Sequence, residues 1–244
     1  MSRALLAVYA QTYTPDREVS VCPQVGTPGI AMRSYLSTHH LWAAEHFTRL
    51  AAESEATHTG QPRFSIKNRA YVIGAVGESV AFLEAFINEL YQDAADGGGD
   101  AAGLSPDMAR LMAEYWRTTD NAKAVEVTKK YDLARAFAGC PRSDAGRRPH
   151  EDVTYVVKLR NLLVHYTPKT VSAEDPVYTH IYHVRSRFAD NALMAGSGNA
   201  WFPDHALGAG CARWAVQSAR AFGDEFVAVI GCKANYQIAK FDSP

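Results

Sequence analysis

The sequence has few cysteines, and none of them form the close pairs that hold zinc. Its four cysteines stand far apart along the chain, at Cys22, Cys140, Cys211 and Cys232. A zinc knuckle needs closely spaced thiolates, and a disulfide framework needs a dense set of cysteines. We therefore expect reduced thiols that are mostly buried, and neither of these two kinds of small cysteine-rich fold.

An excess of charge of one sign is also lacking, as are long apolar runs. The chain has 25 Lys and Arg against 26 Asp and Glu, which leaves a net charge of -1. This balance provides no overall attraction to nucleic acid, so any RNA contact must come from a local patch. We see no apolar run of the roughly 20 residues that span a bilayer, and residues 4–8 are too few for a signal peptide. We expect a cytoplasmic protein without membrane contact.

The motifs of several enzyme classes are missing. There is no Walker loop for nucleoside triphosphates and no nucleophile-elbow sequence. Three histidines, His39, His40 and His46, stand near Glu45, but no two of them have the i, i+4 spacing of metal ligands on a helix. The sequence therefore predicts no cofactor and no metal site.

Helical periodicity is what the sequence has in quantity. Residues 1–33 hold prolines and glycines between short apolar pieces, a pattern typical of an extended arm or short strands. From Ser34 onward apolar residues recur at helical spacing. We predict an N-terminal arm over 1–33 and a single helical domain over 34–244, in the all-α class.

Breaks in the periodicity divide this domain into helices. A first helix is predicted from Ser34 to the break at 58–62, and the strongest over 66–93, where apolar residues follow at three- and four-residue steps. Ser105 before a proline predicts a capped helix start. Further helices are predicted over 122–137, from about Glu151 until shortly before Pro168, and over 214–229, whereas 176–190 suits a helix or a strand.

The tryptophans are expected to be core and loop anchors rather than base-stacking platforms: Trp42, Trp116, Trp201 and Trp214.

The helix that begins near Glu151 is apolar on most of its circumference. On a helical wheel one apolar arc holds Val153, Val156, Val157, Leu163 and Val164. A second arc holds Tyr155, Leu159, Leu162 and Tyr166, and a narrow polar stripe holds Thr154, Lys158, Asn161 and His165. Such a helix is expected to be central and buried. Arg160 falls inside the first arc, and because it cannot lose its charge it needs an acidic residue, a phosphate or a second subunit as partner.

The segment Arg160-Asn161-Leu162-Leu163-Val164-His165, followed by Tyr166-Thr167-Pro168, resembles the motif of the HEPN superfamily. The resemblance implies an HEPN-like up-and-down helical bundle that pairs about a two-fold axis and brings two copies of the motif to one cleft. Pairing matters because Arg160 and His165 lie about 140° apart on an ideal helix, so that one copy points them to different faces. Some toxin members place a tyrosine two positions after the histidine, where this chain has Thr167, so modification at that position is not expected here.

What the resemblance implies for function is a metal-independent endoribonuclease, acting as a toxin or defence effector. His165 would be the acid or base, Arg160 would hold the phosphate, and Asn161 would orient the histidine or a phosphate. Substrate contacts are assigned to Lys158 and Tyr166 on the same helix and to Arg147 and Arg148 in the basic loop before it. The partners implied are RNA, a second copy of the chain, and an antitoxin or other regulatory protein.

Two other interpretations stay open at this point. In the first, the chain is a non-catalytic dimerisation or RNA-binding module of the same build, where Arg160 and His165 hold the core or an interface. Arg160 would then form a buried ion pair with Glu78 or Glu84 of the helix over 66–93. In the second, the chain binds a small ligand, although no motif in the sequence supports this.

Overall fold

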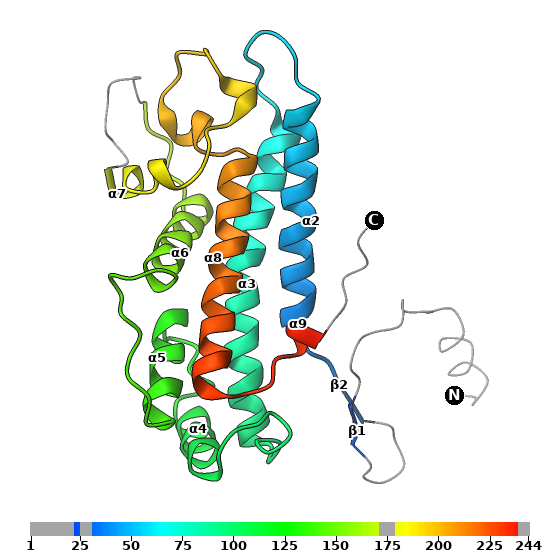
Figure 1. The fold of residues 1–244 in the computed structure, drawn as a ribbon, viewed down its shortest axis with the longest axis vertical. Coiled ribbons are helices and arrows are strands. Elements are labelled where there is room, and N and C mark those ends of the chain that lie inside the picture. The colour runs from blue at the N-terminus through cyan, green and yellow to red at the C-terminus, as the bar shows by residue number, and fades with distance from the viewer. Residues whose placement is uncertain (1–21, 25–30, 171–178, 239–244) are drawn as a thin grey trace, which may run out of the picture.

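The computed structural model describes residues 22–24, 31–170 and 179–238. The strands β1 (Cys22–Gln24) and β2 (Ala31–Arg33) pair antiparallel, with Cys22 opposite Arg33. The rest of the described chain is helical or irregular, which confirms the all-α class (Figure 1). Its helices are α2 (Ser37–Ala56), α3 (Ile66–Ala95), α4 (Pro106–Thr118), α5 (Val127–Phe137), α6 (His150–Val164), α7 (Thr179–Tyr182), α8 (Ala209–Ile230) and α9 (Asn235–Ile238). Shorter helical turns lie at Arg185–Arg187, Ala192–Met194 and Trp201–His205.

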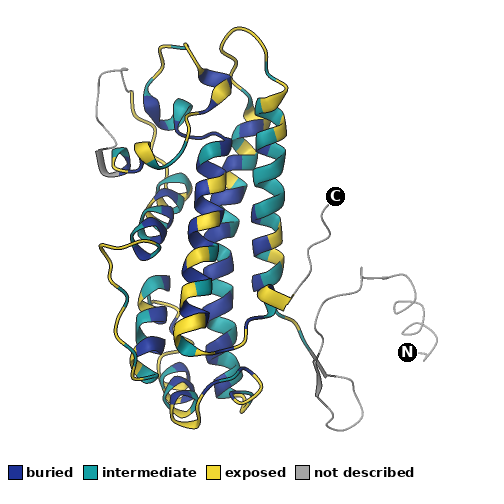
Figure 2. Ribbon diagram, viewed as in Figure 1, coloured by how far each residue is buried: buried dark blue, intermediate teal, exposed yellow. Residues whose placement is uncertain are grey.

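The long helix α3 lies at the centre, with α2 and α8 alongside it and α4, α5 and α6 packed around them (Figure 1). Figure 2 shows buried residues along α3 and α8 where they face each other. One apolar cluster surrounds Phe86, Tyr131 and Phe226, and a second joins Val76, Val156 and other residues of α3, α6 and α8. Burial of one such side chain contributes about 1.5–3 kcal/mol. The periodic stripe of the sequence is therefore the stripe that forms the core.

Helix α3 corrects our expectation about apolar runs. By length and composition it could cross a membrane, although half of its most apolar window is buried inside the molecule. It packs against α2, α4, α6 and α8, so most of its apolar side chains face other helices, whereas Ile66 and Ile73 are exposed. A helix buried in this way is typical of a protein core, so its length and composition are weak evidence for a membrane span.

The helix starts show which local signals were sufficient. The Ser105 hydroxyl accepts a hydrogen bond from the backbone N–H of Met108, which confirms the predicted cap of α4. Ser65 caps α3 in the same way. Helix α2 has no side-chain cap of its own. Instead Glu89, from the middle of α3, accepts hydrogen bonds from the backbone N–H and the hydroxyl of Ser37 at 2.8 and 2.6 Å.

Several predicted boundaries need correction. Helix α2 begins at Ser37, and α5 begins at Val127 rather than at 122 because three residues before it have positive φ: Asp120, Asn121 and Ala122. Helix α6 ends at Val164, ahead of the proline that was expected to end it. In the ambiguous region, residues 179–187 form short helical turns rather than a strand, and 176–178 lie outside the described residues.

Cys140, Cys211 and Cys232 are free thiols; the last two are buried and Cys140 is half-buried.

Candidate functional site

Helix α6 lies at the side of the bundle and not at its centre, which corrects the prediction of a central, buried helix. Val153 and Val156 are fully buried against α3 and α8. In the last turn Leu162 and Leu163 still pack against the second cluster, whereas Val164 is 63% exposed and Tyr166, just beyond the helix, is 42% exposed. The centre is occupied by α3, so only one face of α6 has a core to pack against. The candidate motif therefore stands at the end of a helix that emerges from the core.

Arg160 has no counter-ion in the described part of the chain. It follows Val153 and Val156 on the buried face, and its side chain is half-buried. Its Nε atom is buried and has no hydrogen-bond partner among the residues that the structure describes. Leaving a buried donor unpaired costs about 1–3 kcal/mol. Native proteins pair most such groups, so this one calls for an explanation.

The ion pairs that the sequence suggested for Arg160 are not formed. Glu78 binds the Nδ1 atom of His40 through its Oε2 at 2.6 Å. Glu84 binds the ammonium group of Lys130, which is itself buried. The interpretation of Arg160 as the partner of either glutamate is therefore wrong.

His165 directly follows the last residue of α6, and its side chain is exposed. Its backbone N–H donates to the carbonyl oxygen of Asn161 at 2.9 Å. Asn161 and His165 are both within the described residues, and their side chains form no hydrogen bond with each other. The expected orienting contact is therefore not made in the single chain. Asn161 is itself exposed. Arg160 is half-buried within α6, whereas His165 follows the helix and is exposed.

The predicted substrate-binding residues fall into two groups. Lys158 is exposed, with its ammonium group 5.1 Å from the centre of the Tyr155 ring, and Tyr166 directly follows His165. Arg147 and Arg148 lie before the start of α6, and Arg148 pairs with Asp152 at 3.4 Å. The start of the helix is about 15 Å from Arg160 at the usual rise per residue. In one chain these two arginines therefore do not join the motif, and they stay candidates only for contacts further along a ligand.

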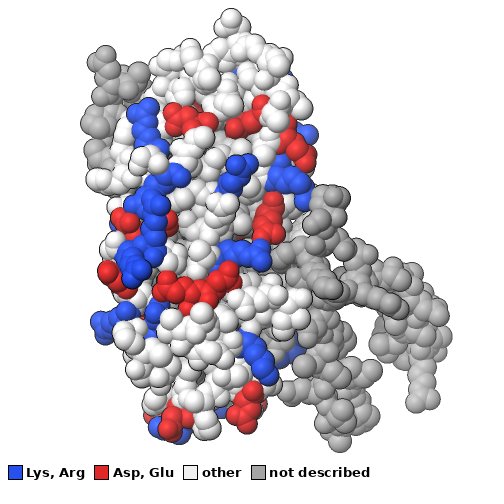
Figure 3. All heavy atoms as spheres, in the orientation of Figure 1, with Lys and Arg blue, Asp and Glu red and all other residues white. Residues whose placement is uncertain are grey.

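The sequence analysis missed two residues near the outer face of α6. The His183 ring lies 6.4 Å from the Tyr155 ring. Arg187 bonds Asp152 and, at 2.9 Å, Glu151, which fixes the turn over 183–187 against the helix. Their segment had an ambiguous pattern, so nothing in it pointed to α6. Figure 3 shows basic side chains along the side of the molecule where α6 lies.

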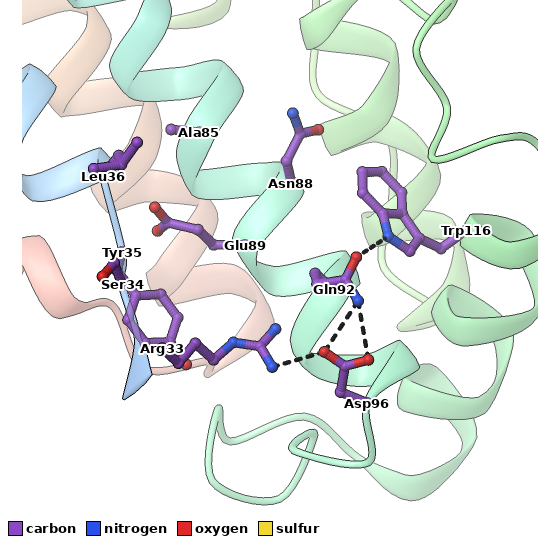
Figure 4. Close-up of a pocket in the computed structure, with 10 residues that line it drawn as sticks. All are labelled: Arg33, Ser34, Tyr35, Leu36, Ala85, Asn88, Glu89, Gln92, Asp96 and Trp116. Carbon is purple, nitrogen blue, oxygen red and sulfur yellow. Dashed lines mark hydrogen bonds and ion pairs between the residues drawn. The ribbon is translucent and has the colours of Figure 1, made fainter. Parts of the chain in front are cut away.

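An open pocket of about 640 Å³ lies elsewhere, between the entry to α2, the second half of α3 and α4 (Figure 4). Its polar groups are largely occupied with one another. The Trp116 indole donates to Gln92 at 2.8 Å, the Gln92 amide donates to Asp96, and Arg33 pairs with Asp96 at 2.7 Å. Burial raises the pKa of Glu89 above its usual value, against the opposing effect of its hydrogen bonds from Ser37. Because its polar groups bond to each other, we interpret this pocket as part of the contact between the start of α2 and α3.

The histidines that were weighed as metal ligands have other partners. His40 binds Glu78, and the Nδ1 atom of His46 accepts a hydrogen bond from Arg49 at 2.7 Å. Over residues 31–170 and 179–238 no group of three or more His, Cys, Asp and Glu side chains is placed to hold a metal ion.

Comparison of the chain with protein-family models, with curated proteins and with solved structures gave no match.

Proposed function

We propose that this chain is a metal-independent endoribonuclease with an HEPN-like helical bundle, and that it acts as a symmetric homodimer. The observation that carries the proposal is the half-buried Arg160, which has no partner among the described residues and stands five positions before the exposed His165. An arginine that keeps its charge without a protein partner is suited to bind a phosphate. The exposed imidazole is suited to transfer protons near neutral pH.

The spacing of the two residues supports a dimer. On an ideal helix Arg160 and His165 lie about 140° apart, so one chain is not expected to present both groups to one phosphate. The turn after Arg160 exposes Val164 and Tyr166, which gives the end of α6 an apolar surface for a second copy. In a two-fold arrangement, Arg160 of one chain and His165 of the other can face the same cleft.

The reaction follows from these groups and from the RNA. The 2′-hydroxyl oxygen attacks the neighbouring phosphorus while one His165 takes its proton. The bond from phosphorus to the 5′-oxygen of the next nucleotide breaks, and the partner subunit's His165 donates a proton to that oxygen. Arg160 stabilises the negative charge that gathers on the non-bridging oxygens. The products are a 2′,3′-cyclic phosphate and a free 5′-hydroxyl.

The remaining candidate residues contact the RNA on either side of the cleaved bond. Lys158 is exposed in the middle of α6 and Tyr166 is exposed just beyond its end, so both can contact nucleotides near the cut. Arg147 and Arg148, at the opposite end of the helix, are assigned to phosphates further away. An enzyme that cuts cellular RNA needs control, so we assign the chain to the toxin or defence class, held by an antitoxin or other regulatory protein.

The test compares cleavage of total RNA by the purified wild type, His165→Ala and Arg160→Ala in the presence of a chelator. We expect cleavage by the wild type, a loss of about 10²- to 10⁴-fold for His165→Ala and of about 10²- to 10³-fold for Arg160→Ala. His39→Ala, an exposed histidine on α2, is the matched control and should cleave like the wild type. A need for added metal, or equal activity in all four proteins, would refute the proposal.

One observation favours a second candidate, a non-catalytic RNA-binding dimerisation module of the same build. The Asn161 amide does not hold the His165 ring, although a catalytic histidine benefits from such an orienting contact. This candidate predicts RNA binding and dimer formation by the wild type without any cleaved product. The same assay with a binding measurement separates the two candidates.

A further inference from the structure

A groove lies between α2 and α8, on the side of α8 that faces away from α6 (Figure 1). Its volume is about 500 Å³. The residues that line it are Glu45, Thr48, Arg49, Ala52, Arg213, Val216, Gln217 and Arg220. Three arginines and one glutamate thus meet in a single groove, in a chain whose net charge is only -1. The groove is a local concentration of positive charge.

The three arginines differ in how far they are occupied. Arg220 pairs with Glu45 at 2.7 Å. Arg49 donates to His46 and lies 3.9 Å from the exposed carboxylate of Glu53. Arg213 is exposed and forms no hydrogen bond or ion pair with any residue that the structure describes. At least one guanidinium group in the groove is therefore available to a ligand.

These cations are spaced along the groove and not gathered at one point. Arg213 and Arg220 lie on the same face of α8, about 10 Å apart along the helix axis. Arg49 faces them from α2, which runs antiparallel to α8 (Figure 1). Figure 3 shows basic side chains spaced over the face formed by α8 and α2, with acidic side chains between them. A row of cations fits a ligand with several phosphates better than it fits a single anion.

An exposed aromatic ring extends the same face of α2. Trp42 precedes Glu45 and Arg49 at three- and four-residue steps, and its side chain is 45% exposed. The other three tryptophans are buried, so the expectation that all four are core or loop anchors is wrong for Trp42. One side of the indole stacks on the His46 ring, with centroids 4.9 Å apart and an angle of 8° between the planes. Because Arg49 always donates, His46 accepts at Nδ1, and this bond orients the pair.

We propose that the groove between α2 and α8 binds single-stranded RNA, with its arginines on the phosphates and the Trp42 indole stacked on a base. Basic side chains along a groove together with an accessible aromatic ring are what recognition of single strands requires. The choice of RNA rests on the proposed ribonuclease function. The groove is a separate surface from the α6 motif, since α8 lies between them, and it serves to hold the strand outside the cleavage site.

The experiment measures binding of a labelled oligouridylate RNA of about 12 nucleotides by fluorescence anisotropy, at several salt concentrations. The protein carries His165→Ala in every case, so that cleavage does not disturb the equilibrium. Added to this background, Arg213→Gln should weaken binding several-fold. It should also reduce the slope of log K against log salt concentration by about one, because one phosphate contact is lost. Trp42→Ala should weaken binding about tenfold, and Trp42→Phe, which keeps an aromatic face, should recover much of the loss.

Arg110→Gln is the matched control, because Arg110 is an exposed arginine on α4, paired with Glu114 at 3.8 Å and remote from the groove. It should bind RNA like the background protein. If Arg213→Gln and Trp42→Ala also bind like this control, the groove proposal is overturned. The proposal is also overturned if inorganic pyrophosphate, at matched phosphate concentration, displaces the RNA completely, because the groove then binds a small anion. RNA binding through the groove, combined with no cleavage by the protein that retains His165, would support the groove and refute the ribonuclease.

Discussion

Replacing Arg160 by methionine separates a binding role of this residue from a structural one. Methionine keeps an unbranched apolar stem and removes the guanidinium group, whose Nε atom is buried without a partner. An unpaired buried donor costs about 1–3 kcal/mol, and the substitution removes that cost. We therefore expect the free energy of unfolding of Arg160→Met to equal that of the wild type or to exceed it by up to about 3 kcal/mol, while cleavage is lost.

The assay is urea denaturation followed by circular dichroism, at two protein concentrations because dimer formation stabilises the folded chain. Lys130→Met is the control for a cation that does have partners. Its ammonium group is buried and binds Glu84 and, at 2.9 Å, Asn88. Removing one partner of such a buried pair costs about 3–5 kcal/mol.

If Arg160→Met loses as much stability as Lys130→Met at both concentrations, Arg160 is not a free phosphate-binding group. That result would mean that Arg160 holds the core, as the structural interpretation of the motif requires. A loss that appears only at the concentration where the wild type is dimeric would instead place the partner of Arg160 in the second copy.

Two further predictions concern local features of the fold. Ser105→Ala removes the cap of α4 and should lower the free energy of unfolding by about 1 kcal/mol; an unchanged urea midpoint would argue against this cap. Burial raises the pKa of Glu89 above its usual 4.5, so this carboxyl group contributes stability that is present at low pH and lost as the pH rises through the folded pKa. Glu89→Gln should thus gain stability relative to the wild type as the pH rises above the usual pKa of the carboxyl group, and a difference that does not change with pH would contradict it.

Features with a local cause could be predicted from the sequence. The apolar stripe over 66–93 became α3, because three- and four-residue spacing places side chains on one helix face whatever surrounds it. Ser105 acts as predicted, since a cap needs only the backbone of the next turn. The polar stripe of α6 also lies outward, where Lys158, Asn161 and His165 are exposed.

Features that depend on distant neighbours could not be predicted in this way. The cap of α2 comes from Glu89, far along the chain. Both apolar arcs of α6 suggested a central helix, but the pattern does not show that α3 already occupies the centre. Asp120 and Asn121 delay the start of α5 because their left-handed backbone interrupts a segment whose composition suits a helix.

The sequence by itself determined the all-α class and the main helices, because helical geometry follows from spacing along the chain. Only the tertiary structure decided that Glu78 and Glu84 have other partners and that Arg160 is left without one. It alone also exposed Trp42 beside a basic groove. The physical reason is that the partner of a charge and the burial of a ring depend on which helices pack together.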